Sequence, residues 1–374
     1  MTLNGILTIN RTILNRTLPF NNDKENLEVV PLDELLGLDI LPFKMTKLVM
    51  LEVAYMAQML PSYKEATSEL NKKLGYKISW SLVRDVAIFV GNLVYQEDLR
   101  KALTTQNNLV NSIPDIKEKI KGELYILIDG AALNTRIEDK NGSTWRENKL
   151  GMSFASINII KRGKDDKNGH IITKKEYTAF IGSAEDFKKF VYQIAINQGY
   201  GTYEKTIVLG DGATWIRTMC EEIFPDAIQI LDLFHLEENI YNFAKYIFKN
   251  NEEKYIPWAK KIIDNIMEQN VPKALKEIEN YSKSRLPSGV VNLKGYINNN
   301  IDKINYKDYK LSGYFVGSGA IESGNKTILQ RRLKQAGMRW SPETAQPILT
   351  LRAKVESELW NDVKQLVMNY PNTP

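Results

Sequence analysis

The sequence has few of the residues that build the commonest metal and redox sites. Its 374 residues include one cysteine, Cys220, and two histidines, His170 and His235. A single cysteine excludes an intrachain disulfide and a cysteine-built zinc site. Two histidines exclude a catalytic centre with several histidine ligands. A hydrolytic metal ion would therefore have to be held mainly by carboxylates.

Long apolar runs are also missing. No window approaches the roughly 18 apolar residues of a transmembrane helix, and the first fifteen residues lack the apolar centre of a signal peptide. We therefore expect a cytoplasmic protein. With 43% hydrophobic and 25% charged residues, the composition is that of a globular protein and excludes a disordered or fibrous chain. The net charge of +5 is too small to indicate nucleic-acid binding by itself.

The pattern of apolar residues predicts an α/β fold, more strictly an α+β fold with a mixed sheet. Strand patterns and helix patterns follow in the order three strands, helix, strand, helix, strand, which calls for helices on the faces of the sheet. The expected strands are 123–129, 152–161, 171–181, 205–210 and 227–233. The expected domains are an irregular segment 1–46, helices and a linker 47–121, a first core part 122–235, a helical insertion 236–312 and a second core part with C-terminal helices 313–374.

Three helices are expected near the N-terminus, over 47–60, over 63–74 and from Ser79 onward. Ser62 can cap the second helix, and Gly75 can end it. Two helices joined by a tight turn with glycine form the helix-turn-helix pattern of DNA-binding proteins. A three-helix packing unit without DNA-binding function fits the same pattern.

Two aspartates follow short apolar strands in matching contexts, Asp129 in LIDGA and Asp211 in LGDGA. A carboxylate at the C-terminal end of a strand faces the crevice where α/β sheets bind ligands. Two carboxylates on neighbouring strands would need a cation between them. Oxygen ligands without histidine or cysteine favour Mg²⁺ or Mn²⁺, and two such ions can promote phosphodiester hydrolysis. Alternatively, each aspartate only caps the turn after its strand.

A third carboxylate, Glu322, lies in GSGAIESGNK at the start of a helix expected over 319–336. Five basic residues and one acidic residue stand between Glu322 and Arg339, so the local charge is far more positive than that of the whole chain. We expect the basic side chains to contact DNA phosphates, although a solvated charged helix face is the alternative. They are Lys326, Arg331, Arg332, Lys334 and Arg339. Trp145, Trp215 and Trp340 are expected to pack in the core.

These motifs resemble those of DDE-type insertion-sequence transposases, in particular the bacterial ISLre/ISKra-type branch related to Mutator-like elements. The resemblance rests on LIDGAA (127–132), WRENKLG (145–151), VLGDGATWI (208–216), LDLFHL (231–236) and GSGAIESGNKTILQRRLKQAGMRWS (317–341). It implies an RNase H-like core in which Asp129, Asp211 and Glu322 bind two Mg²⁺ or Mn²⁺ ions. It also implies double-stranded DNA as partner and a homodimer on DNA.

The same resemblance draws attention to His235. Mutator-like enzymes carry a Cys/Asp-x-x-His motif after the second aspartate, and Asp232-Leu-Phe-His235 fits it. His235 is thus a candidate catalytic residue, while a structural histidine paired with Asp232 is the alternative. Members of the branch often begin with a cysteine-rich zinc-binding segment, which this sequence does not show. We therefore expect the helices within 47–95 to recognise DNA ends.

The function expected from the sequence is metal-dependent cleavage at transposon ends followed by strand transfer. An RNase H-like nuclease or resolvase that does not join strands is the first alternative. A non-catalytic DNA-binding protein derived from a transposase is the second. A glycosidase with paired carboxylates is disfavoured, because it would not need the basic residues that follow Glu322.

Overall fold

A five-stranded mixed sheet forms the centre of the fold, as the sequence predicted. The computed structural model describes residues 14–17, 26–29, 41–75, 77–107, 118–140, 142–161, 169–281 and 286–371. The chain forms two compact units. The first contains Met1–Arg100, Leu133–Arg146 and Thr327–Pro374, and the second contains Lys101–Ala132 and Glu147–Lys326.

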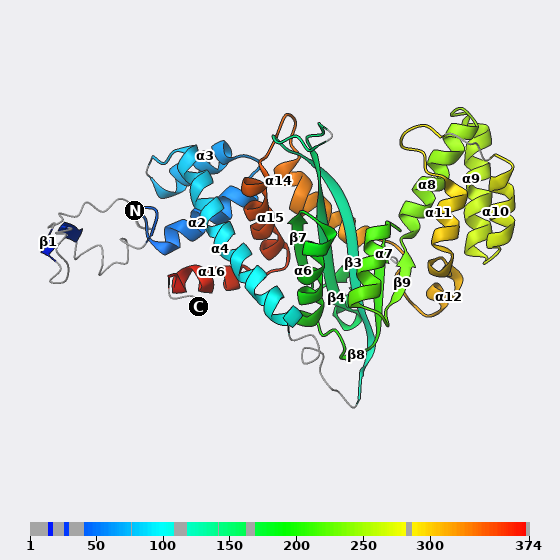
Figure 1. The fold of residues 1–374 in the computed structure, drawn as a ribbon, viewed down its shortest axis with the longest axis horizontal. Helices are drawn as coiled ribbons and strands as arrows, with labels where there is room; N and C mark the ends of the chain where they lie inside the picture. Colours follow the sequence, from blue (N-terminus) through cyan, green and yellow to red (C-terminus); the bar gives the residue numbers. More distant parts are fainter. Residues whose placement is uncertain are drawn as a thin grey trace. The chain divides into compact units, whose positions relative to one another are not determined.

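The sheet has the strand order β7-β4-β3-β8-β9 (Figure 1). Its strands are β3 (Ile120–Asn134), β4 (Trp145–Ala155), β7 (Glu176–Ile181), β8 (Tyr203–Gly210) and β9 (Ile228–Leu231). β3, β8 and β9 run parallel, while β4 and β7 pair antiparallel. The connecting helices are α6 (Ala184–Asn197) and α7 (Thr214–Ile223), and α6 packs against both β7 and α7. The predicted element order is therefore confirmed.

Three strand predictions were wrong in detail. The strand expected to end at Asp129 continues to Asn134, and Gly130 does not turn the backbone. The strand expected over 152–161 breaks after Ala155, where the short 3₁₀ turn Ser156–Asn158 leads into β5 (Ile159–Lys161). The strand expected over 171–181 is divided into β6 (His170–Ile172) and β7, which belong to different sheets. β5 pairs antiparallel with β6, and the loop between them lies outside the described residues.

The segment expected as a helical insertion follows the sheet, and its first helix begins at Leu233. It contains α8 (Leu233–Ile247), α9 (Glu252–Met267), α10 (Val271–Glu279), α11 (Leu293–Asn299), the 3₁₀ turn Ile301–Lys303 and α12 (Tyr306–Leu311). Its helices pack on one another, with α9 against α8, α10 and α12. The rings of Phe243, Phe248, Trp258 and Tyr281 meet at their centre. The insertion thus has an aromatic core of its own.

The first compact unit joins the N-terminal helices to the C-terminal ones. Its long helices are α2 (Lys47–Met59), α3 (Tyr63–Leu74), α4 (Trp80–Asn107), α15 (Pro342–Glu356) and α16 (Trp360–Asn369). α2 packs against α15 and α16. The compact unit therefore draws on four of the predicted domains, 1–46, 47–121, 122–235 and 313–374. The described part of the segment 1–46, expected to be irregular, includes the antiparallel strands β1 (Leu14–Thr17) and β2 (Asn26–Val29).

The helix expected over 319–336 is interrupted. It consists of α13 (Gly319–Gly324), a π-helical segment (Asn325–Gln330) and α14 (Arg331–Leu333). π-Helical turns are rare and occur often at functional sites. The single helix expected at the C-terminus is also divided, because Glu358 adopts a positive φ between α15 and α16. None of the described helices combines the length and apolar character needed to span a bilayer.

Candidate active site

Asp129 of β3 lies close to Asp211, which directly follows the adjacent parallel strand β8. The register of these strands pairs Leu127 of β3 with Leu209 of β8, and each aspartate stands two residues further along its own chain. Side chains two residues apart share a face of a strand. Because neighbouring strands are about 4.8 Å apart, the two carboxylates come close together. The expectation that these strands are neighbours is thus correct, although Asp129 lies within its strand and not at its end.

The two carboxylates differ in their surroundings. Asp129 is 8% exposed, and its side chain accepts hydrogen bonds from the backbone N–H of Gly130 and from the amide of Asn325. Burial raises the pKa of Asp129, and the nearby charge of Asp211 raises it further, against the opposing effect of His235. The ionised form of Asp129 is thus destabilised mainly by burial and further by its like-charged neighbour.

Asp211 is held at the turn that follows β8. Its Oδ1 accepts the backbone N–H of Ala213 at 2.8 Å, and its backbone carbonyl accepts the hydroxyl of Tyr296 at 2.8 Å. Gly212 has a φ of +83°, a conformation that glycine adopts without strain. The capping role considered as an alternative for Asp211 is therefore present, together with its proximity to Asp129.

Asp232 is the centre of a second group of contacts. It is fully buried and caps α8, and its carboxylate accepts hydrogen bonds from His235 Nδ1 at 2.5 Å and from Ser318 N and Oγ at 2.8 and 2.6 Å. Burial alone would raise the pKa of Asp232, but the bonds from His235 and Ser318 hold it below its usual value. The structure thus gives His235 the carboxylate partner that was considered for it.

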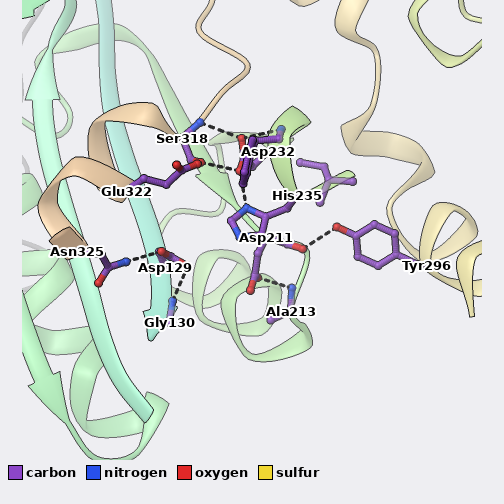
Figure 2. A network of polar contacts seen from close by, with 12 residues as sticks. Asp129, Gly130, Asp211, Ala213, Asp232, His235, Tyr296, Ser318, Glu322 and Asn325 are labelled. Atoms are coloured by element: carbon purple, nitrogen blue, oxygen red, sulfur yellow. Dashed lines mark hydrogen bonds and ion pairs between the residues drawn. The ribbon is translucent and has the colours of Figure 1, made fainter. Parts of the chain in front are cut away.

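His235 is the positive group of this site. The hydrogen bond that His235 donates to Asp232 raises the pKa of His235 from 6.5 to about 9 in spite of burial, and the charges of Asp129 and Asp211 add to the effect. Figure 2 shows its ring beneath Asp232, toward Asp211. An imidazolium at this position compensates part of the negative charge of the three aspartates.

Glu322 belongs to the same polar network but contacts Ser318. Its Oε1 lies 2.8 Å from Ser318 Oγ, which is also bonded to Asp232 (Figure 2). A hydroxyl group has one proton, so it donates to only one of the two carboxylates at a time. Three residues after Glu322, on the same side of the helix, Asn325 reaches Asp129. The loop before α13 and the helix itself therefore connect the third carboxylate to both aspartate groups.

The donors of this site suit a hard divalent cation. Asp129 and Asp211 supply carboxylate oxygens, the ligands that such a cation prefers. Glu322 does not complete a cage in this arrangement, because it is bonded to Ser318. Within the described ranges, no group of three or more histidine, cysteine, aspartate or glutamate side chains is arranged to hold a metal ion. The binding of a metal ion by the three carboxylates stays a prediction.

A cavity of about 730 Å³ opens beside Asp211. The turn after β8 forms one part of its wall, and the insertion forms the other through Asn239 and the segment around α11. Arg217 and the amides of Asn292 and Asn299 give it several hydrogen-bond donors. The volume is within the range of about 300–1,000 Å³ that is common for ligand sites.

Of the five basic residues predicted to contact DNA, four are exposed and one is buried. Lys326, Arg331, Lys334 and Arg339 are exposed, as that role requires. Arg332 is 1% exposed, and its Nε donates to the carbonyl of Ala57 at 3.0 Å, so it does not belong to an exposed basic face as its neighbours do.

Two of the tryptophans expected in the core differ in burial. Trp340 packs in the core as expected, whereas Trp145 is the first residue of β4, at its exposed end, and is 52% exposed.

Sequence reasoning missed Ser318, Asn325 and Tyr296. The first two lie in the motif around Glu322, but nothing in their local pattern marks them as partners of the aspartates.

The comparison with protein families matches residues 24–365 to an uncharacterised protein family, UPF0236. The chain belongs to this family. The family match includes Asp129, Asp211, Asp232, His235 and Glu322, so the whole site lies within the region that defines the family. No curated protein matches the chain.

Proposed function

We propose that this UPF0236 member is a DDE-type DNA transposase of the ISLre/ISKra-type branch with an RNase H-like core. The observation that carries the proposal is the proximity of Asp129 and Asp211, each two residues beyond the paired Leu127 and Leu209 of the adjacent parallel strands β3 and β8. The element order agrees with the core that the sequence motifs led us to expect. Glu322 lies in the same network through Ser318, which supports its role as the third carboxylate.

In this proposal, Asp129 and Asp211 hold Mg²⁺ or Mn²⁺, and Glu322 joins them when it leaves Ser318. The bound ions, two in number, supply an activated water and charge stabilisation for phosphodiester hydrolysis and strand transfer. Asn325 fixes the orientation of Asp129 through its amide, and Tyr296 fixes the backbone at Asp211. His235 contributes positive charge near the scissile phosphate, held in place by Asp232.

The partners follow from this chemistry. The substrate is double-stranded DNA at the ends of a mobile element, and the cavity beside Asp211 is the space available for a strand at the site. Exposed cations after Glu322, among them Lys326 and Arg331, contact phosphates. Two ends must be joined, so the active form is a homodimer on DNA, acting in the cytoplasm.

The test uses the full chain and labelled duplex DNA taken from the borders of its own gene, with Mg²⁺ or Mn²⁺. Asp129→Asn and Asp211→Asn should each reduce cleavage by well over a hundredfold, since loss of partners around a metal ligand alone costs about 10- to 100-fold. Asp226→Asn is the matched control, because Asp226 is an exposed aspartate of the same compact unit outside the network.

Each result has a distinct meaning. Cleavage that survives Asp129→Asn refutes the triad. Cleavage without joining of strands favours a nuclease or resolvase, and binding without cleavage favours a DNA-binding protein derived from a transposase.

A further inference from the structure

A second cavity, of about 570 Å³, lies wholly within the first compact unit. Its wall combines aromatic rings with cationic side chains, and no acidic residue is among those that line it. The lining cations are Lys64, Arg84, Arg136, Arg332 and Arg339. Such a combination is typical of sites that bind nucleic-acid strands, where cations track phosphates and rings stack on bases.

The buried Arg332 is the clearest sign of a missing anion. Its guanidinium lies over the rings of Tyr63 and Trp340, 4.4 and 5.1 Å from their centroids, and burial lowers its pKa. It forms no ion pair within the described residues, and its Nη2 has no hydrogen-bond partner. Glu65 acts on it only from a distance, being hydrogen-bonded to Ser62. A buried charge without a counter-ion is costly, and an anion in the adjoining cavity would reduce that cost.

The hydroxyl of Tyr63 is a second unsatisfied group at this cavity. It is buried and has no hydrogen-bond partner, and burial raises its pKa to about 12, so it remains a neutral donor at physiological pH. Two donors without acceptors, Tyr63 and Arg332, thus line one cavity whose rim carries further cations. An anion with several acceptor oxygens, such as a phosphate, could accept hydrogen bonds from both groups.

Trp80 adds a surface for a base. It is the first residue of α4 and is 47% exposed, which is unusual for an indole. The guanidinium of Arg84, one turn further along the helix, lies over one face of this ring, 5.5 Å from its centroid, and also forms an ion pair with Asp85. A base stacked on the other face of Trp80 would have this cation nearby for the neighbouring phosphate. The ring of Trp340 is less suited to stacking, because it is buried and covered by Arg332.

We propose that this cavity binds an unpaired nucleotide of a DNA strand, with the base on Trp80 and the flanking phosphates near Arg84, Arg136 and Arg339. A base-paired nucleotide cannot offer its face to Trp80, so the site selects single-stranded or frayed ends over an intact duplex. The inference rests on the proposed function, since it gives the transposase a contact for strand ends apart from the carboxylate site.

The test measures binding of a fluorescein-labelled twelve-nucleotide oligothymidylate to the full chain by fluorescence anisotropy, in EDTA. Trp80→Leu should weaken binding by about tenfold or more, the loss expected for one stacked base, while Trp80→Phe should stay within about threefold of the wild type. Arg84→Gln should weaken binding and reduce its dependence on salt. Arg100→Gln is the matched control, because Arg100 is an exposed arginine of the same helix outside the cavity lining. Thermal unfolding of each variant confirms that it is folded.

Three outcomes overturn the proposal. Equal affinity of Trp80→Leu and wild type would remove the stacking site. Tighter binding of a blunt twelve-base-pair duplex, independent of Trp80, would make the surface a duplex phosphate contact. Competition by free thymidine monophosphate at the same concentration as the oligonucleotide would indicate a site for a small nucleotide. Because EDTA prevents cleavage, failure here is distinct from failure of the carboxylate chemistry.

Discussion

Replacement of Gly324 by alanine tests how closely the helix that carries Glu322 packs on the sheet. A Cβ at Gly324 would lie 2.7 Å from Tyr177 Cε1 and 3.2 Å from Leu150 Cδ2. Both neighbours are buried side chains of the sheet, on β7 and β4. Neither has room to move without disturbing its own packing. Overpacking of this kind usually costs about 1–3 kcal/mol.

The matched control is Gly319→Ala, at the other end of α13. A Cβ at Gly319 meets no atom within 4 Å. Both substitutions gain helix propensity, worth up to about 1 kcal/mol, so the difference between the two variants isolates the clash. We expect Gly324→Ala to be less stable than Gly319→Ala by about 1–3 kcal/mol. In a unit of this size, that difference corresponds to roughly 2–12 °C in melting temperature.

Thermal unfolding followed by circular dichroism measures the difference. Adding Tyr177→Leu to Gly324→Ala removes the ring that the new methyl group meets, so the double variant should lose less stability than the two single effects predict together. If Gly324→Ala melts at or above the melting temperature of Gly319→Ala, the packing of α13 on the sheet is not as described. The position given for Glu322 on that helix would then also be wrong.

Two further predictions concern buried charges. In EDTA, the raised pKa of His235 stabilises the fold by roughly 3 kcal/mol below pH 6.5, and this stability is lost as pH rises through about 9. Urea unfolding should therefore show His235→Gln to be less stable than the wild type at pH 6 and nearly as stable at pH 10. A stability difference that stays constant with pH would contradict the pairing of His235 with Asp232. Arg352 donates to the carbonyls of Gln58, Thr327 and Ile328 from a buried position. Arg352→Met should lower the free energy of unfolding by at least about 3 kcal/mol, because each buried carbonyl that loses this donor costs about 1–3 kcal/mol. A smaller loss in urea unfolding would show that these hydrogen bonds do not stabilise the unit.

Local signals in the sequence were sufficient where a residue acts on its own chain neighbours. Ser62 caps α3 through the N–H of Glu65, and Gly75 ends that helix with a φ of +69°. Both features were predicted because capping depends on residues within one turn. The turn after β8 was found for the same reason, since Asp211 and Gly212 form it between them.

Local signals failed where a distant strand or helix decides the conformation. The pair Asp129-Gly130 resembles a turn, but the backbone stays extended because β3 still has a neighbour there. A Cβ at Gly130 would collide with the carboxylate of Glu147 on β4. This carboxylate is the end of a flexible side chain that can move aside, so the neighbouring strand, which the sequence around Gly130 does not show, decides the conformation.

Arg332 shows the same limit for charges. Its basic neighbours suggested an exposed face, yet its position opposite the carbonyl of Ala57 and the rings of Tyr63 and Trp340 makes it a buried cation. These partners stand far from it in the sequence. Charge counting therefore found a basic region but could not separate the cation that packs inside from those that face solvent.

The carboxylates of the site illustrate what the sequence and the fold each contribute. The matching contexts of Asp129 and Asp211 were visible in the sequence, and the parallel pairing of β3 and β8 makes them neighbours. The charge balance around them was not visible, because His235, Ser318 and Asn325 reach the aspartates only through the packing of α8 and α13. Without a divalent cation, the fold offers one imidazolium and several hydrogen-bond donors against three aspartates. Burial raises the pKa of Asp129, and the charge of Asp211 adds to this effect against that of His235. The divalent cation of the proposed function would stabilise the ionised form of Asp129 beside Asp211.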